Sequence, residues 1–329
     1  MARLGYAPQW NASAPVSRGQ RIKFVDAFDD MLIAHETGNT VSVLEPSTGA
    51  RRWSLDLAGP LAKFIGNLRL PEGDVLSASE DEVFVLDGRS GVIKKRQKLA
   101  VLANTRPVLA GNTVVFGCGT GEVLGHNLIS GYKLWGFQMP GAIEGDLAVI
   151  GPFVGAVSQT GEIVVLDPAR GASVGRARIF DGVNVPPASS EDSMFIAGRD
   201  RSVWGFTALT DSKPLWRVRT ERPLRDRPVH HEGTVFVTIA ERGLTALDAF
   251  TGEVKWSNKD ATGSVVAVRR GRLIVWNGET AFAVDPERGD IHERTELPGV
   301  SRIVFDAFVD GNAYLVEPAG LVQKFSPRN

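Results

Sequence analysis

One short pattern recurs about every 40 residues along this chain and limits its possible folds more than any other feature. In each copy a hydrophobic strand ends at an acidic or polar residue, a turn closed by glycine follows, and a second strand begins. The closing positions are Gly49, Gly91, Gly131, Gly171, the degenerate Ser212, Gly252 and Gly289. They lie 37 to 42 residues apart. A fixed period of this length, built from short strands, predicts a propeller or a solenoid.

Composition agrees with a turn-rich architecture and excludes several classes of function. The 329 residues include 36 glycines and 18 prolines, which suits many turns rather than long helices. Lysine plus arginine total 37 against 38 acidic residues, so the chain lacks the basic excess of a nucleic-acid binder. Its one cysteine, Cys118, cannot form an internal disulfide or a multi-cysteine metal site. We predict a buried, inert thiol at a strand end.

Each repeat can be divided into strands, and the sixth copy is the clearest. Residues 234–239 and 243–248 form a hairpin, residues 254–256 run back beside it, and residues 264–268 begin the next unit. Four strands with their turns occupy about 40 residues, which is one propeller blade. The recurring turn residues should cap the turns through backbone hydrogen bonds rather than serve catalysis; they are Glu45, Asp87, Asp167, Asp248 and Asp285.

The two ends of the chain complement each other. The last unit runs through residues 314–325 and stops where its final turn glycine would be due. At the other end, residues 1–11 carry Trp10 at the place where tryptophan closes other units, with no earlier strands before it. We predict that residues 1–11 supply the outer strand of the last blade and remove an open sheet edge. The expected fold is a single all-β, eight-bladed propeller of four-stranded antiparallel blades over residues 1–329.

The repeat resembles that of the quinoprotein dehydrogenase-like β-propellers, which contain PQQ-like repeats. The shared motif is a hydrophobic strand, Leu-Asp, a Thr-Gly turn and a closing tryptophan, and it recurs over essentially the whole chain. In that family the tryptophans dock between neighbouring blades, which here implies Trp10, Trp53, Trp135, Trp216 and Trp256. The family has an enzymatic branch of PQQ-dependent alcohol and glucose dehydrogenases and a non-enzymatic, BamB-like branch.

The residues favour the non-enzymatic branch. The dehydrogenases hold PQQ against a disulfide between adjacent cysteines, which a chain with one cysteine cannot form, and they are much longer. Trp276, Asn277 and Glu279 offer an aromatic ring and two oxygen ligands, but a calcium site needs six to eight oxygens. We therefore predict an ordinary turn there, no cofactor, no metal and no catalytic residues. A PQQ- and calcium-dependent enzyme, or a propeller that senses a small ligand or carbohydrate, remains the alternative.

Departures from the repeat are where function is expected, because loops carry it on a rigid frame. Residues 217–231 combine arginines, prolines and an apolar leucine, a mixture typical of contact surfaces. The predicted partner-binding residues are Leu224, Arg225, Asp226 and Arg227. The segment also resembles a BamB connection that binds the assembly partner, which implicates Leu224, Arg225 and Pro228. A solvated loop is the simpler alternative. Residues 180–190 form a second, less charged connection of this kind.

The expected function is therefore a non-catalytic scaffold for one or more protein partners, acting as a monomer or within a hetero-complex. No nucleic-acid partner is expected. No apolar run approaches the 18 or so residues that span a bilayer, and the first ten residues lack a hydrophobic signal core. As written the chain is expected in the cytoplasm; the alternative, if an export signal has been removed, is the periplasm or the outer membrane.

Overall fold

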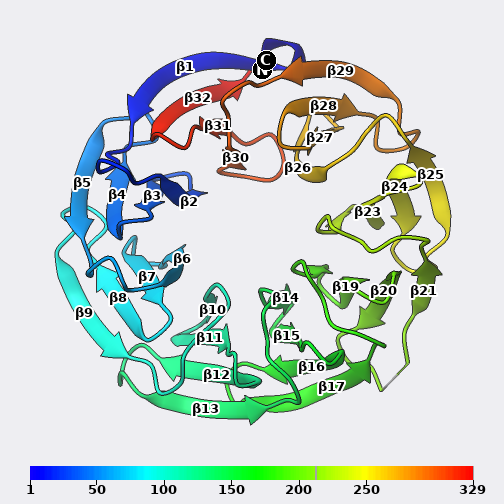
Figure 1. The fold of residues 1–329 in the computed structure, drawn as a ribbon, viewed down its shortest axis with the longest axis horizontal. Helices are drawn as coiled ribbons and strands as arrows, with labels where there is room; N and C mark the ends of the chain where they lie inside the picture. The colour runs from blue at the N-terminus through cyan, green and yellow to red at the C-terminus, as the bar shows by residue number, and fades with distance from the viewer. Residues whose placement is uncertain (212, 329) are drawn as a thin grey trace. The chain divides into compact units, whose positions relative to one another are not determined.

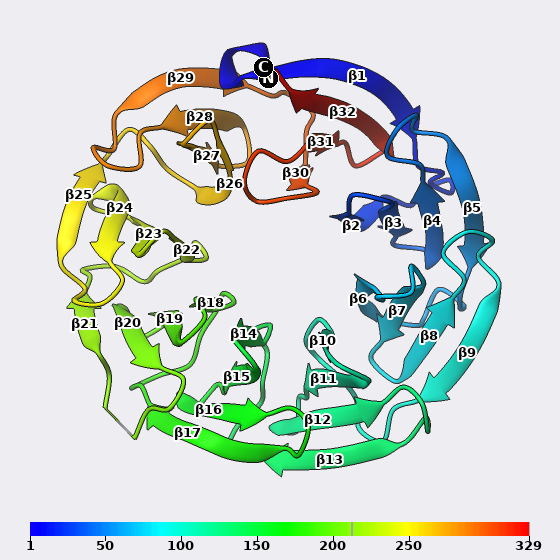
Figure 2. The same cartoon turned by 180° about the vertical axis from the view of Figure 1, so that it is seen from behind.

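The computed structural model of the chain describes residues 1–211 and 213–328 as eight four-stranded antiparallel sheets. The only helix among these residues is a single 3-10 turn, η1 (Ala2–Leu4). The all-β, eight-bladed propeller fold with four-stranded blades is confirmed (Figures 1 and 2). Ser212, the degenerate turn position, lies outside the described residues. By its internal contacts the chain divides into two compact units, and the single-domain organisation over residues 1–329 stays a prediction.

Unit 1 comprises Met1–Ser77, Phe84–Arg96 and Ala261–Asn329. It holds three complete sheets. Their strands are β2 (Ile22–Ala27), β3 (Leu32–Glu36), β4 (Thr40–Leu44) and β5 (Arg51–Asp56); β26 (Ser264–Arg269), β27 (Arg272–Trp276), β28 (Thr280–Val284) and β29 (Ile291–Glu296); and β30 (Arg302–Phe305), β31 (Ala313–Val316) and β32 (Leu321–Pro327) with β1 (Tyr6–Ser13).

Unit 2 comprises Ala78–Val83 and Gln97–Asp260 and holds four sheets. Their strands are β10 (Val108–Ala110), β11 (Thr113–Gly117), β12 (Glu122–Asn127) and β13 (Lys133–Gln138); β14 (Ala148–Ile150), β15 (Phe153–Val157), β16 (Glu162–Asp167) and β17 (Ala172–Arg178); β18 (Ala188–Ser189), β19 (Ser193–Gly198), β20 (Ser202–Thr207) and β21 (Trp216–Arg219); and β22 (Val229–His231), β23 (Thr234–Ile239), β24 (Gly243–Asp248) and β25 (Val254–Asn258). The residues of the eighth sheet are shared between the units: β6 (Phe64–Arg69), β7 (Val75–Ser79), β8 (Glu82–Leu86) and β9 (Ile93–Lys98).

The two central strands of each sheet form the core, and the fourth strand faces solvent. In the β10–β13 sheet, every residue of β11 is buried, whereas β13 alternates between exposed and half-buried side chains. Strand β9 carries Lys94, Lys95 and Lys98 and is largely exposed. Such central strands bury side chains on both faces of the sheet, so their sequences are almost continuously apolar.

The turn chemistry follows the prediction with one difference. Gly91 and Gly252 both have φ of 74°, a backbone conformation that favours glycine. Asp248 Oδ1 accepts backbone N–H groups from Phe250 and Thr251, each at 2.9 Å, and Asp87, Asp167 and Asp285 make equivalent bonds. The difference is Glu45, which bonds the Arg52 guanidinium at 2.7 Å instead. Its longer side chain reaches past the turn backbone.

Four of the predicted docking tryptophans make one repeated contact. The indole N–H groups of Trp10, Trp53, Trp135 and Trp216 donate to turn carbonyls of the next repeat, on Pro46, Gly88, Pro168 and Ala249, at 2.9–3.0 Å. Each ring also covers the turn glycine there. A Cβ added to Gly91 would lie 2.7 Å from the Trp53 ring, and one on Gly252 would lie 2.6 Å from Trp216. The turn glycine is therefore needed twice, for its φ and for the docked ring. Trp256 is buried and packs against Phe236, with ring centroids 5.9 Å apart.

The N-terminal segment completes the last sheet, as predicted. Strand β1 pairs antiparallel with β32 from Tyr6 opposite Pro327 to Ser13 opposite Leu321 (Figure 1). The strand extends two residues beyond the predicted segment of residues 1–11, and Tyr6 is fully buried. Met1 and Leu4 are also buried in the same cluster of apolar side chains.

A buried histidine in unit 1 makes stability depend on pH. His35 is fully buried between the rings of Phe24 and Phe64, with each ring centroid 4.6 Å from its own. Neither of its ring nitrogens has a hydrogen-bond partner among the described residues. Burial lowers the pKa of His35 from 6.5 to about 4.

We expect the free energy of unfolding to fall as pH drops from about 6.5 to about 4, because only the unfolded chain takes up this proton in that window. When this contribution of His35 is lost completely, the free energy of unfolding falls by an amount on the order of 3 kcal/mol. Urea denaturation at pH 7, 5.5 and 4.5 measures it. The His35→Leu variant should flatten the pH dependence, while His231→Leu should not. An equal slope in parent and His35→Leu would contradict the assignment.

Candidate interaction site

The segment singled out by sequence begins and ends in strands, so only residues 220–228 form a loop, between β21 and β22. Leu224 is 3% exposed and packs in a core cluster with Trp216 and Val235. Leu224 therefore contributes to the core of unit 2. In the sequence, a leucine between charged residues suggests a surface anchor. In the structure, Leu224 packs against the sheet and attaches the loop to it.

The other predicted residues differ in whether they line a recess in the surface. Arg225 is exposed and Asp226 half-buried, and both line a recess of about 320 Å³ with Arg222, Pro223, Thr238 and Ala240. We call this the loop recess. Burial raises the pKa of Asp226. Arg227 does not line the loop recess. Surrounding protein lowers its pKa, an effect that Asp146 opposes, and the Asp146 carboxylate in turn accepts the Arg106 backbone N–H at 2.9 Å.

Four exposed arginines make no side-chain bond within residues 1–211 and 213–328. Arg222 and Arg225 line the loop recess, whereas Arg201 and Arg219 lie outside its lining, next to the start of the loop. Arg201 sits in a tight turn at φ 59°, and its carbonyl accepts the Thr220 N–H at 2.9 Å, which ties this turn to the start of the loop. On the acidic side, Glu241 Oε1 accepts the Glu221 N–H at 2.9 Å. Four guanidinium groups are thus left without an internal carboxylate.

The second connection noted in the sequence meets the first through one arginine. The guanidinium of Arg217 lies 4.4 Å from the Trp204 ring centroid and 4.8 Å from that of Phe180. It also pairs with Asp200 at 3.3 Å and bonds Ser202 Oγ at 2.9 Å. Phe180 is still 78% exposed. The connection that carries Phe180 therefore contacts strand β21 through Arg217, and no pattern in the sequence indicated this contact.

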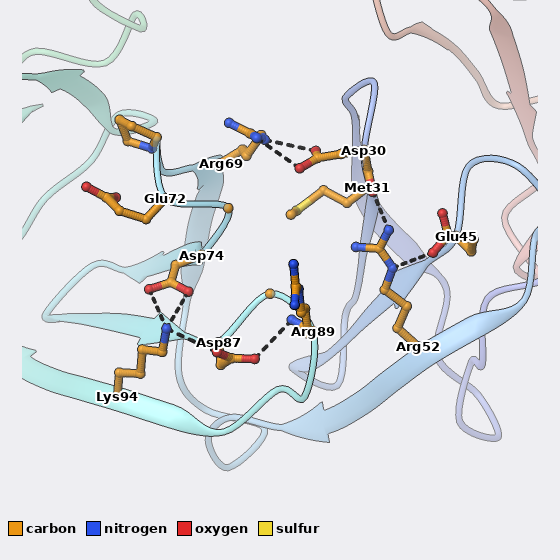
Figure 3. A pocket seen from close by; sticks show the side chains of 13 residues that line it. Asp30, Met31, Glu45, Arg52, Arg69, Glu72, Asp74, Asp87, Arg89 and Lys94 are labelled. Carbon is orange, nitrogen blue, oxygen red and sulfur yellow. Dashed lines mark hydrogen bonds and ion pairs between the residues drawn. The ribbon is translucent and has the colours of Figure 1, made fainter.

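A larger recess in unit 1, of about 710 Å³, is lined almost wholly by charged groups (Figure 3). Most of these pair internally: Arg52 with Glu45 at 2.7 Å, Arg69 with Asp30 at 2.8 Å, and Lys94 with Asp74 at 2.7 Å and Asp87 at 3.1 Å. The hydrogen bonds that Arg69 donates to the Asp30 carboxylate raise the pKa of Arg69. We call this recess of unit 1 the charged recess. Its charges hold neighbouring turns together, which explains the charges without a ligand.

The residues considered for a quinone and calcium site do not fit one. Asn277 Oδ1 accepts the backbone N–H groups of Glu279 at 3.0 Å and Thr280 at 2.8 Å, so its oxygen caps the turn rather than facing a metal. Cys118 is buried, and burial raises its pKa to about 12. Within the described residues no three histidine, cysteine or acidic side chains are placed to hold a metal ion. No described helix is long and apolar enough to cross a membrane.

Comparison with known proteins places the chain in a family. The family model described as outer membrane protein assembly factor BamB matches residues 7–146 and 159–302. The chain belongs to this family. BamB from Moraxella catarrhalis has a similar crystal structure, with a TM-score of 0.73 and 16% identity over 96% of this chain and 98% of that one. The computationally designed protein Ika8 gives 0.76 and 14% identity over 97% and 100%. At these identities both likenesses concern the fold alone.

One curated relative is named for an enzyme activity. The polyvinylalcohol dehydrogenase of a Pseudomonas species is 24% identical over 200 residues, which cover 49% of this chain. The match spans 31% of the length of that relative. The proteins that this chain matches thus carry two kinds of name, an assembly factor and a dehydrogenase.

Proposed function

We propose that this member of the BamB family is a non-catalytic platform that binds a protein partner through the loop recess. The observation that carries the proposal is a recess lined by two exposed arginines without internal partners, Arg222 and Arg225, together with Pro223. Arginine is enriched at the centres of protein interfaces, and an exposed aromatic such as Phe180 is a common companion. The likeness to BamB supports the same proposal, since that protein is described as an assembly factor.

Removing two arginines should separate binding from folding. We expect Arg222→Ala with Arg225→Ala to weaken capture of the native partner about fivefold or more, since interface anchors typically contribute over 1 kcal/mol. Thermal stability should stay within about 0.5 kcal/mol of the parent, because both side chains are exposed. The measurement pairs thermal melting with affinity pulldown from the native host, read by quantitative mass spectrometry.

Two control variants sharpen this test. Arg170→Ala with Arg288→Ala removes two exposed arginines from turns elsewhere and should leave capture unchanged. Leu224→Ala should instead lower stability by about 2–5 kcal/mol, because it leaves a cavity in the core. Equal partner yields from the parent and the Arg222/Arg225 variant would contradict the loop recess as the binding surface.

The second candidate function is a quinone-dependent dehydrogenase, favoured by the match to the polyvinylalcohol dehydrogenase. Its test is the absorption spectrum and the calcium content of the purified protein after incubation with PQQ and calcium. A bound quinone with one calcium ion per chain would replace the platform proposal. A protein that stays colourless and retains no calcium under these conditions would support the platform.

A further inference from the structure

Unit 2 contains a second recess, with a chemistry unlike that of the other two. It has a volume of about 510 Å³ and lies among the turn before β19, the strand β22 and the turn after β24. We call it the Phe250 recess. Its lining comprises Ser190, Glu191, Asp192, Ser193, Phe195, Leu215, His230, Gly233, Ala249 and Phe250. Phe250 is 77% exposed, so one aromatic face is open to whatever enters.

The Phe250 recess occupies the same place in the repeat as the charged recess of unit 1. Ala249 and Phe250 follow the turn residue Asp248, just as Gly88 and Arg89 follow Asp87. In the charged recess most carboxylates pair with a cation of the same unit. In the Phe250 recess Glu191 and Asp192 have no ion pair within the described parts of the chain. Equivalent positions of the repeat thus carry mostly ion-paired side chains in the charged recess and carboxylates without an ion pair in the Phe250 recess.

On the acidic side of the Phe250 recess, internal hydrogen bonds hold Asp192 in place. Asp192 Oδ1 accepts the hydroxyl groups of Ser190 and Ser193, each at 2.9 Å, and these bonds hold its pKa below the usual range. The carboxylate is therefore ionised and fixed in place at neutral pH. Ser190 Oγ also accepts the Ser193 N–H at 3.0 Å, so the whole turn is rigid.

The other wall is aromatic and backed by the core. The His230 ring stacks on Phe195 at 5.4 Å, and Phe195 stacks on the docked Trp216 at 6.0 Å. Burial lowers the pKa of His230; the nearby His231 lowers it further, and Asp192 opposes the shift. A neutral imidazole offers both a flat face and a nitrogen that can accept a hydrogen bond. The recess therefore combines two aromatic faces with two exposed carboxylates, of which Asp192 is fixed by hydrogen bonds.

The same unit shows which group this combination suits. Arg217 stacks on Trp204 and Phe180 while pairing with Asp200, an internal case of one guanidinium held by aromatic rings and a carboxylate. A guanidinium is planar, so it stacks flat on aromatic rings and presents its N–H donors in a fixed fork, whereas an ammonium is a compact point charge without a flat face.

We propose that the Phe250 recess binds an arginine side chain of a partner protein, with its guanidinium between Phe250 and the Asp192 carboxylate. This site goes beyond the loop recess. It takes a cationic group where the loop recess presents arginines of its own, so either site can hold or fail without the other.

The direct test uses capped arginine, N-acetyl-L-arginine N-methylamide, as the probe and the full chain as the receptor. The His230 ring resonance, assigned by comparison with His230→Gln, should shift and saturate in the millimolar range. The neutral isostere N-acetyl-L-citrulline N-methylamide should cause no saturable shift. Phe250→Ala and Asp192→Asn should each weaken binding about fivefold or more, whereas the exposed controls Leu209→Ala and Glu232→Gln should not change it.

Several outcomes would overturn the proposal. One is equal binding of the arginine and citrulline probes, which would remove the role of charge. Another is unchanged affinity in either Phe250→Ala or Asp192→Asn, provided that thermal melting shows both variants folded. An equal shift at His292, which is part-exposed and lies near a different carboxylate, would mark non-specific association and would also overturn it.

Discussion

Deleting residues 1–13 is expected to cause aggregation on expression, or a loss of most of the stability of the last sheet. The deletion removes all of β1 and leaves the backbone of β32 as an unpaired edge, a template for pairing with other chains. It also removes Tyr6 and Leu4 from a core cluster and Trp10 from its bond to Pro46. Truncating one large buried side chain costs about 3–5 kcal/mol, against a total stability of about 5–15 kcal/mol.

The deletion is judged by soluble yield and by the midpoint of thermal unfolding. Gln9→Ala with Asn11→Ala is the matched control, because both side chains are exposed on the same strand and the backbone pairing is kept. This control should melt with the parent. If the truncated protein also melted within a few degrees of the parent, β1 would contribute little, and the closure of the last sheet by the N-terminal segment would be wrong.

Trp53→Ala is expected to lower the free energy of unfolding by about 3–5 kcal/mol. The indole is 8% exposed, packs in the core cluster that includes Phe24 and Phe84, and donates a buried hydrogen bond to the Gly88 carbonyl. The substitution removes the packing and leaves that carbonyl without its partner. Since repeat units contact mainly their neighbours, the damage should begin near the β2–β5 sheet. Denaturant unfolding with hydrogen exchange read by mass spectrometry locates it.

Two further substitutions divide the Trp53 effect into parts. Trp53→Phe keeps an aromatic ring but loses the indole N–H, so the smaller cost of an unpaired carbonyl, about 1–3 kcal/mol, is expected. Arg51→Ala, an exposed neighbour on the same strand, should change little. Parent-like stability in Trp53→Ala would show that the docked ring does not hold the sheets together.

Much of the fold could be predicted because its cause is local and repeated. Asp248 and Gly252 specify a turn through backbone bonds and a positive φ, whatever surrounds them, and the tryptophan that follows recurs at a fixed distance from that turn. The missing last strand and the unmatched Trp10 likewise belong together, since an unpaired sheet edge is unfavourable. Where the local geometry differs, the prediction failed: Glu45 has one more methylene than aspartate and bonds Arg52 instead of the turn.

The candidate sites could be predicted only in part. The arginine-rich composition of residues 217–231 indicated a contact surface, but each residue's role depends on where its side chain points. Leu224 packs in the core, Arg225 lines the loop recess, and Arg227 lies outside that recess. Neither the stacking of Arg217 on Phe180 nor the recess between Asp192 and Phe250 has any signature in the sequence.

The sequence by itself determined the period, the four-stranded unit and most of the turn chemistry, because each rests on interactions between residues close in the chain or repeated at a constant interval. The closing strand joins opposite ends of the chain, and it could be predicted because the last repeat lacks one strand while the first residues supply an unmatched one. Only the tertiary structure decided which side chains meet. Phe195, His230 and Phe250 come from different strands and turns, and packing places them around one recess. Side-chain contacts between residues far apart in the chain depend on the register and packing of whole sheets, which the sequence alone does not show.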